Sequence, residues 1–354
     1  EGAVLRALRW LKMQQKYDGH WPKTKPAMTS LAILAYLAHG DTPASEEFGS
    51  TVEKAIRFLI ETQQKDGRFR GRDNHDYTQP IAAYALAEAY GMTRVPQVKY
   101  AAEKAIDVVI KGQNKFGGFN YNLKGDADTR NDTTYTSWCV QALKAAKMAG
   151  LYNDGLDACM RKAIGGVKKN YNHMESYRGA FGYTEPNQKS RYALTGAGVL
   201  CLQFLGAANA KETLGGLGYL ENAVCRWDNI PAPYGRSPVY YWYYITQAKF
   251  QHGGQTWNKW NAQFAPTMVN NQTVISKEQS GYVDHKGQPQ EVGHWDSPSK
   301  AEHTGSNGRI MDTALCTLML EVYYRYLPTF QIAEVAEEVD LAEDDDNVDV
   351  QIDI

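Results

Sequence analysis

Apolar residues recur at helical spacing along most of this chain, in segments that alternate between two kinds. The first kind carries its apolar residues on one stripe, whereas the second is apolar on most of its sides. A helix with one apolar stripe covers a partner, and a helix that is apolar all round lies inside the protein. The pattern therefore predicts an all-α protein in which amphipathic outer helices surround more buried inner helices.

Six inner helices are expected, and several of them begin at a residue that can cap free amides. Asp76, Asp132 and Asp312 are such residues, because a short carboxylate side chain accepts hydrogen bonds from the first turn. Glycines such as Gly91 and Gly150 follow several of the segments and favour a helix end. The expected inner helices span residues 29–38, 77–90, 133–149, 190–205, 238–251 and 312–326.

A short motif ends the outer segments and repeats about every 50 residues. It consists of a glutamine, a glycine and then an aromatic residue, at the same offsets in each of three copies. Looser copies end at Phe181 and Trp295. The three regular copies are Gln15, Gly19 and Trp21; Gln63, Gly67 and Phe69; and Gln113, Gly117 and Phe119.

Repeats of this length are supersecondary units, none of which can cover its own apolar face, so they stack on their neighbours. Six such pairs predict an (α/α)6 toroid over residues 1–330, with the inner helices around a central cavity. Trp21, Phe69, Phe119 and Phe181 are then expected in equivalent turns. The insertion at residues 271–309 is longer than an ordinary helix connection, which is typical of a functional lid or a disordered loop.

The repeat motif resembles the QW repeat of squalene-hopene cyclase and other class II terpene cyclases. The six-pair layout is similar to the squalene cyclase/protein prenyltransferase-like α/α toroid superfamily. Within it, the chain looks like bacterial proteins that contain prenyltransferase/squalene oxidase repeats, over the segments ALAEAYGM (85–92), DADT (126–129) and YYRYLP (323–328). This resemblance implies a bacterial toroid whose relatives act on isoprenoids.

The acid centre of class II cyclases has no full counterpart here. Those enzymes protonate an alkene with a DxDD motif, in which neighbouring carboxyl groups orient one proton. With the last aspartate of that motif aligned on Asp132, the proton donor falls on Asn131, and an amide cannot donate that proton. Asp132 and Asp128 remain the catalytic candidates. Asp132 is expected to stay ionised at its helix N-terminus, whereas Asp128 can equally serve as a turn cap.

The zinc centre of prenyltransferases is also incomplete. It uses an aspartate, a cysteine two residues later and a histidine on a later helix. Thr134 occupies the cysteine position, and the apolar run after Asp312 contains no histidine. We therefore expect no metal ion and no other cofactor.

Further candidates lie near the starts of the expected inner helices. His75, between acidic residues, could act as a general base, or it could belong to a helix cap. Aromatic and charged residues there could bind a ligand, or they could be ordinary packing and surface charge. The ligand-binding candidates are Thr134, Tyr135, Asp76, Tyr77, Arg191, Tyr192, Arg236, Tyr240, Trp242 and Asp312.

Charge is divided unevenly along the chain. Residues 331–354 hold ten acidic residues and no lysine or arginine, so the body carries a charge of about +8 under a formal total of −2. Residues 331–341 have the pattern of a short amphipathic helix, and residues 348–354 alternate as a strand does. We expect this acidic tail to contact its own toroid, a second copy or a protein partner.

Several functional classes are excluded by absent patterns. The sequence has no phosphate-binding glycine loop and no basic stripe with interleaved aromatics, so nucleic-acid binding is not expected. No apolar run reaches the ~18 residues of a membrane span. The five cysteines lie among helix-core residues and are expected to be buried thiols rather than disulfides.

Two functions remain open, and the compartment remains open with them. The first is a cyclase-like toroid without a DxDD or zinc centre that binds an apolar or lipid-like molecule, or a protein partner, through its cavity or rim. The second is an enzyme acting on an isoprenoid or lipid-like substrate, with a polysaccharide lyase or hydrolase as a remoter form.

Overall fold

The structure is a computed structural model that describes residues 1–70, 76–188, 192–228, 238–298 and 306–323. Within these residues the chain is mostly helical. The inner helices are α2 (Lys25–His39), α4 (Thr78–Thr93), α6 (Thr133–Ala149), α8 (Tyr192–Phe204), α10 (Pro238–His252) and α13 (Ser306–Leu320). The outer helices are α1 (Gly2–Gln14), α3 (Gly49–Thr62), α5 (Pro96–Lys111), α7 (Leu156–Lys168), α9 (Lys211–Tyr219) and α11 (Gly254–Asn270).

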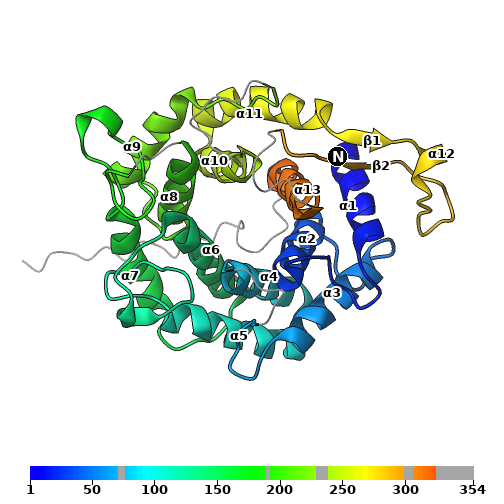
Figure 1. Cartoon of the computed structure of the whole chain (residues 1–354), viewed down its shortest axis with the longest axis horizontal. Coiled ribbons are helices and arrows are strands. Elements are labelled where there is room, and N and C mark those ends of the chain that lie inside the picture. Colours follow the sequence, from blue (N-terminus) through cyan, green and yellow to red (C-terminus); the bar gives the residue numbers. More distant parts are fainter. Residues whose placement is uncertain (71–75, 189–191, 229–237, 299–305, 324–354) are drawn as a thin grey trace, which may run out of the picture.

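The inner helices form a closed ring. Each contacts the next along the chain, and α13 returns to contact α2 (Figure 1). The outer helices surround this ring, as their burial requires: α2 buries every residue from Pro26 to Ala38, whereas α1 buries mainly one side. The predicted α/α toroid of six helix pairs is confirmed.

The repeated glutamine joins consecutive outer helices. Gln63 donates from Nε2 to the carbonyl oxygen of Gly67 in its own turn and to that of Ala101 in α5, at 3.2 and 2.9 Å. Gln15 and Gln113 make the same pair of bonds toward α3 and α7. One amide therefore satisfies a turn carbonyl and a helix carbonyl in each unit, which explains why the residue type recurs.

The aromatic residue of the motif is buried between the two layers. In each case its backbone N–H donates to a polar side chain of the following inner helix, so the turn has one geometry in all five units. The predicted equivalence of the aromatic residues is confirmed. The donor and acceptor residues of these hydrogen bonds are Trp21 and Thr29, Phe69 and Gln79, Phe119 and Thr136, Phe181 and Thr195, and Trp295 and Thr313.

Some helix ends differ from the prediction. Helix α13 begins at Ser306, so Asp312 lies in its second turn and does not cap it. The cap of α4 is Tyr77 rather than Asp76, and α4 continues through Gly91 to Thr93. Aspartate and glycine tolerate these interior positions when tertiary packing outweighs their weak local preferences.

The described part of the insertion, residues 271–298, is here called the clasp. Its strands β1 (Thr273–Ile275) and β2 (Val292–His294) pair antiparallel around a short helix, α12 (Lys277–Ser280). Gln272 at its start donates to the carbonyl oxygen of Ala3 at 2.7 Å, which joins the last unit to the first. Figure 1 shows the clasp beside α1, outside the ring.

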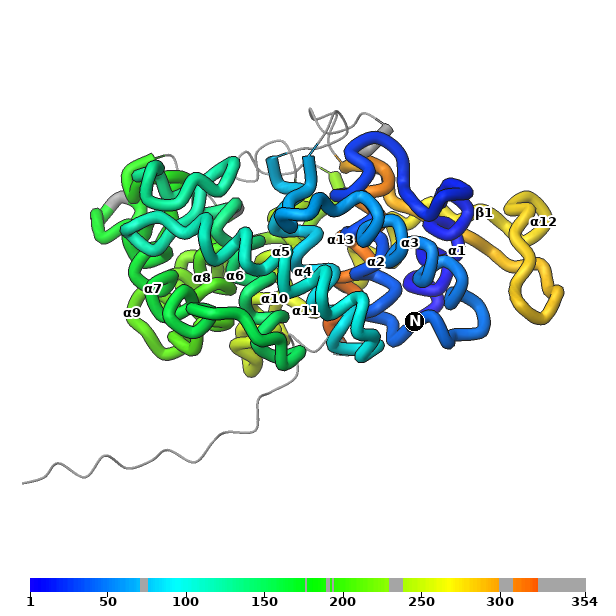
Figure 2. The backbone as a smooth tube through the Cα atoms, turned by 90° about the horizontal axis from the view of Figure 1, so that it is seen from below, coloured from blue at the N-terminus to red at the C-terminus, as the bar shows by residue number. Residues whose placement is uncertain are grey.

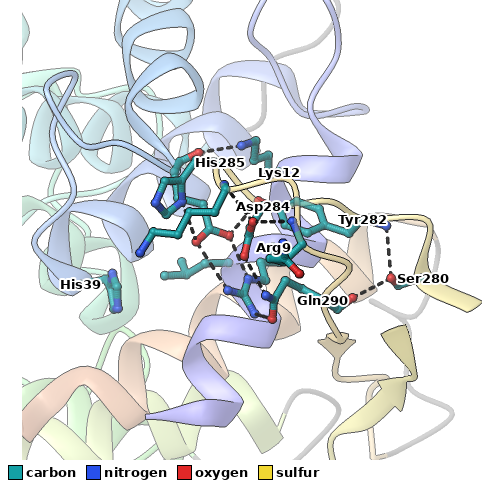
Figure 3. A network of polar contacts seen from close by, with 12 residues as sticks. Arg9, Lys12, His39, Ser280, Tyr282, Asp284, His285 and Gln290 are labelled. Atoms are coloured by element: carbon teal, nitrogen blue, oxygen red, sulfur yellow. Dashed lines mark hydrogen bonds and ion pairs between the residues drawn. The ribbon is translucent and has the colours of Figure 1, made fainter. Parts of the chain in front are cut away.

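A network of polar contacts holds the clasp against α1 and the turn before α3 (Figure 3). Arg9 donates to Glu47 at 2.8 Å and to Gln290 at 2.9 Å, and Tyr282 donates to Glu47 at 3.0 Å. His285 lies 3.0 Å from a carboxylate oxygen of Glu46. The described part of the insertion is therefore an ordered connection held against α1 and not a disordered loop, whereas a role as a lid stays a prediction.

Other expectations have separate outcomes. All five cysteines are buried and free, as predicted. No helix of the described ranges is long and apolar enough to cross a membrane. The acidic tail at residues 331–354 lies outside the described residues, so its contact with a toroid or partner stays a prediction.

Candidate functional site

Asp132 is the N-terminal cap of inner helix α6, as predicted. Its side chain is fully buried, and its Oδ1 accepts hydrogen bonds from the Tyr135 N–H at 2.9 Å and from the Thr134 hydroxyl at 2.7 Å. Figure 2 shows the described turns from outer to inner helices along one edge of the ring, the upper edge in this view. Asp132 ends the turn between α5 and α6. The capping bonds and the helix dipole both favour the carboxylate form.

The second oxygen of Asp132 is different. Oδ2 is buried and receives no hydrogen bond. The hydroxyls of Tyr121 and Tyr183 lie 2.6 Å from each other, and both are close enough to the Asp132 carboxylate to interact with it. Burial chiefly, with a contribution from Asp132, raises the pKa of both tyrosines, so they remain hydroxyl donors.

Counting the available protons shows which of the neighbouring hydroxyls donates each hydrogen bond. Thr134 has a single hydroxyl proton and gives it to Asp132, so Tyr77, 2.9 Å away, must donate to Thr134. The Tyr77 oxygen is then an acceptor for Tyr121 at 3.3 Å. Burial is the main reason that the pKa of Tyr77 is also raised. The hydrogen bonds thus run in a chain from Tyr121 through Tyr77 and Thr134 to the Asp132 carboxylate. Asp132, Thr134 and these tyrosines, together with Tyr183, are here called the tyrosine–aspartate cluster.

Aromatic residues of α10 continue from this cluster. The Trp138 indole donates to the Tyr240 hydroxyl at 2.8 Å, and Tyr240 lies 3.1 Å from the Tyr244 hydroxyl. Tyr240 also contributes to the raised pKa of Tyr77, after burial, which places it beside the cluster. Tyr135 packs its ring against Tyr77 with centroids 5.4 Å apart. The predicted candidates Asp132, Thr134, Tyr135, Tyr77 and Tyr240 are therefore brought together.

Other predicted candidates lie elsewhere. Trp242 is fully buried and donates to Val224 on the outer side of α10, and the Tyr192 ring packs against Tyr219 of α9. Asp128 accepts from Asn120 and from the Arg130 N–H, which is a turn role. Asp76 is exposed near Tyr135. His75, Arg191 and Arg236 fall outside the described residues.

Asp312 is buried in α13 without a contact to the cluster among the described residues. Burial raises its pKa from 3.8 to about 8, and the nearby Asp296 carboxylate adds to the shift. Because no described cation forms an ion pair with Asp312 to offset this burial, the raised pKa favours its protonated form in the folded protein at neutral pH.

This burial predicts a pH dependence of stability. Between pH 4 and pH 8 the folded state holds a proton on Asp312 that the unfolded state has released, so the free energy of unfolding falls as pH rises. We expect the Asp312→Asn protein to melt above the wild type at pH 8, and the gap to shrink at pH 5. Thermal melts at both pH values test this, and equal pH slopes for the two proteins would contradict it.

The described residues contain no group of three His, Cys, Asp or Glu side chains that could hold a metal ion. Among the residues that the structure describes, Asp132 is also the only carboxylate in the cluster's hydrogen-bond network. The groups that the cluster can present to a ligand are therefore one carboxylate acceptor, several hydroxyl donors and aromatic rings.

Tyr121 and Tyr183 were not among the predicted site residues. They lie in irregular turns, where hydrophobic periodicity carries no information. The repeat does contain a signal for them, because Tyr121 follows Phe119 at the same offset as Tyr183 follows Phe181. Equivalent positions in adjacent units of a ring are neighbours, so the two hydroxyls meet.

Comparisons with known proteins identify the fold of this chain but do not assign it to a family. No family model matches the chain, and no curated protein matches it. Solved structures do match, among them a glycoside hydrolase family 76 mannosidase from Bacteroides thetaiotaomicron, with a TM-score of 0.62 and 12% identity, covering 92% of this chain and 99% of that one.

Two other solved structures represent different activities on the same architecture. The cellobiose 2-epimerase from Bacillus thermoamylovorans has a TM-score of 0.54 and 16% identity, over 84% of this chain and 87% of its own. A type II terpene cyclase from Scytonema, bound to merosterolic acid A, has a TM-score of 0.55 and 11% identity, and the match covers 92% of this chain and 97% of the cyclase chain. The expected likeness to terpene cyclases is thus a likeness of fold, which a mannosidase and an epimerase show as well, and the chain is an α/α toroid.

Proposed function

We propose that this protein binds a carbohydrate at the tyrosine–aspartate cluster. The observation that carries the proposal is the buried Oδ2 of Asp132, an acceptor without a hydrogen bond beside the half-buried Tyr121 and Tyr183. A buried carboxylate oxygen without a donor is costly unless a ligand or water supplies one. A sugar hydroxyl is such a donor, and charge-assisted hydrogen bonds of this kind are strong.

The surrounding residues suit the same ligand. Sugars present both hydroxyls and apolar C–H faces, so they combine with tyrosine, which offers a ring and a polar tip. Four tyrosines, Tyr77, Tyr121, Tyr183 and Tyr240, supply these groups around one helix end. Similar folds include a mannosidase and a cellobiose 2-epimerase, which supports a carbohydrate without identifying one.

The proposal is one of binding rather than hydrolysis. Glycosidases place two carboxyl groups about 5 to 9.5 Å apart, one on each side of the scissile bond. The cluster contains a single carboxylate among the described residues. With three tyrosines whose pKa values lie above the ordinary range, it is arranged to donate and accept hydrogen bonds at neutral pH.

An apolar or lipid-like ligand is the second candidate. The aromatic residues beside the cluster favour it, since Trp138 stacks on Tyr243 with ring centroids 5.7 Å apart and also contacts the Tyr240 ring. The terpene cyclase of the same fold is consistent with such a ligand. A lipid would, however, supply no hydroxyl donor of its own to Oδ2 of Asp132, and for this reason carbohydrate is placed first.

Direct binding distinguishes the two candidates. We expect gluco- and manno-oligosaccharides to give saturable heats in isothermal titration calorimetry, and the Tyr121→Phe/Tyr183→Phe protein to lose at least about tenfold in affinity. Tyr152→Phe, which removes an exposed tyrosine hydroxyl outside the cluster, is the matched control. Binding of isoprenoid alcohols alone would favour the second candidate, and binding of neither class would refute the cluster as a ligand site.

A further inference from the structure

Arg130 lies beside the tyrosine–aspartate cluster with its backbone held on both sides. Its N–H donates to Asp128 at 2.9 Å, and its carbonyl oxygen accepts from Asn114 at 3.0 Å. Its guanidinium carbon lies 5.4 Å from the centre of the Tyr183 ring. The direction of this side chain is therefore set by the turn and by a cation–π contact.

The guanidinium has no ionic partner within the described part of the chain. No described carboxylate lies within ion-pair distance of it, whereas Arg9, Arg70 and Arg309 each contact an acidic side chain. The one acidic residue bound to Arg130, Asp128, contacts its backbone. An arginine stacked on a ring keeps the edge of its planar fork free, and that edge matches a carboxylate with two parallel hydrogen bonds.

We propose that Arg130 binds a carboxylate carried by the carbohydrate whose hydroxyls occupy the cluster, so that the ligand is an acidic sugar of the uronate class. This inference rests on the proposed function and refines it. Tyr183 connects the two halves of the site, because its ring contacts Arg130 and its hydroxyl faces Tyr121 and Asp132. The second, independent sign of a ligand is the buried Oδ2 of Asp132.

The charges of the site fit this ligand. Asp132 is buried beneath the Thr134 hydroxyl and the Tyr135 amide, which leaves its free oxygen for a neutral hydroxyl donor. Arg130 is exposed at the rim, where it can reach an anionic substituent. The described toroid belongs to the part of the chain that carries about +8, which favours the approach of an anion.

The test compares two oligosaccharides of matched length and linkage, one neutral and one anionic. Calorimetry would use a neutral gluco-oligosaccharide and the glucurono-oligosaccharide of the same length and linkage. We expect the wild type to prefer the uronate by roughly tenfold or more, and Arg130→Gln to remove this preference by weakening uronate binding more than binding of the neutral ligand. Arg130→Lys should restore only part of it, since an ammonium lacks the planar fork. Arg161→Gln, on outer helix α7, is the charge-matched control.

Each outcome decides between the claims. Equal wild-type affinity for both oligosaccharides would overturn the role of Arg130 and leave carbohydrate binding intact. An equal loss for both ligands in Arg130→Gln would also overturn it, because the residue would then support the turn rather than read a charge. If the wild type binds neither oligosaccharide, the proposed function itself is wrong.

Discussion

Replacement of Gly117 by alanine is expected to lower the free energy of unfolding by about 3 kcal/mol, since a left-handed backbone costs ~1 kcal/mol and overpacking ~1–3 kcal/mol. Gly117 has a φ of +90°, and an added Cβ would lie 2.1 Å from the carbonyl oxygen of Lys162 in α7. Backbone cannot move aside as a side chain can. The turn and the adjacent outer helix would therefore have to separate.

Gly150 provides the control for this experiment. It also has a positive φ, +73°, but an added Cβ would meet nothing within 4 Å. Gly150→Ala is therefore expected to cost only the backbone strain, ~1 kcal/mol. Urea unfolding of both variants measures the difference. Similar midpoints for the two proteins would show that the close approach of turn and helix does not limit stability.

Asp132→Asn is expected to weaken carbohydrate binding by roughly ten- to a hundredfold, the loss of one or two hydrogen bonds to a charged group. Asparagine is as good a helix cap as aspartate, so its oxygen can still accept from Tyr135 and Thr134. Its amide nitrogen would then occupy the position of Oδ2, where it presents a donor to a ligand hydroxyl and to two tyrosine hydroxyls. The change removes the acceptor without removing the cap.

Calorimetric affinity and a thermal melt should be measured on the same samples. The expected result is a large loss of affinity with a melting temperature close to that of the wild type. Asp157→Asn, an exposed position on α7, removes one negative charge away from the cluster and controls for net charge. An Asp132→Asn protein that binds as the wild type does would exclude Asp132 from the ligand site.

The architecture was predictable because the same physical need recurs in every unit. A glutamine that satisfies two carbonyls, a glycine against the next helix and an aromatic between the layers leave a pattern that repeats in the sequence. Asp132 was predictable as a cap for a similar reason, since capping is a local interaction. The start of α13 was not, because Asp312 is buried through tertiary packing.

The site was only partly predictable. Tyr121 and Tyr183 meet through the juxtaposition of two turns 62 residues apart, and no local preference encodes that distance. Tyr192 and Trp242 show the opposite case. Both lie on inner helices, yet a helix apolar on most sides does not reveal which side faces the axis and which faces α9 or Val224.

Closure of the ring by the clasp has a consequence for how this chain folds. The hydrogen bond from Gln272 to Ala3 spans 269 residues, and α13 must also reach α1 and α2. Contacts between residues so far apart in the sequence require a long loop to close, which costs conformational entropy and slows folding. During synthesis, α1 emerges long before its final partners β2 and α13. The unit that contains α1 therefore completes its contacts late, and its apolar stripe stays exposed until those partners have been made.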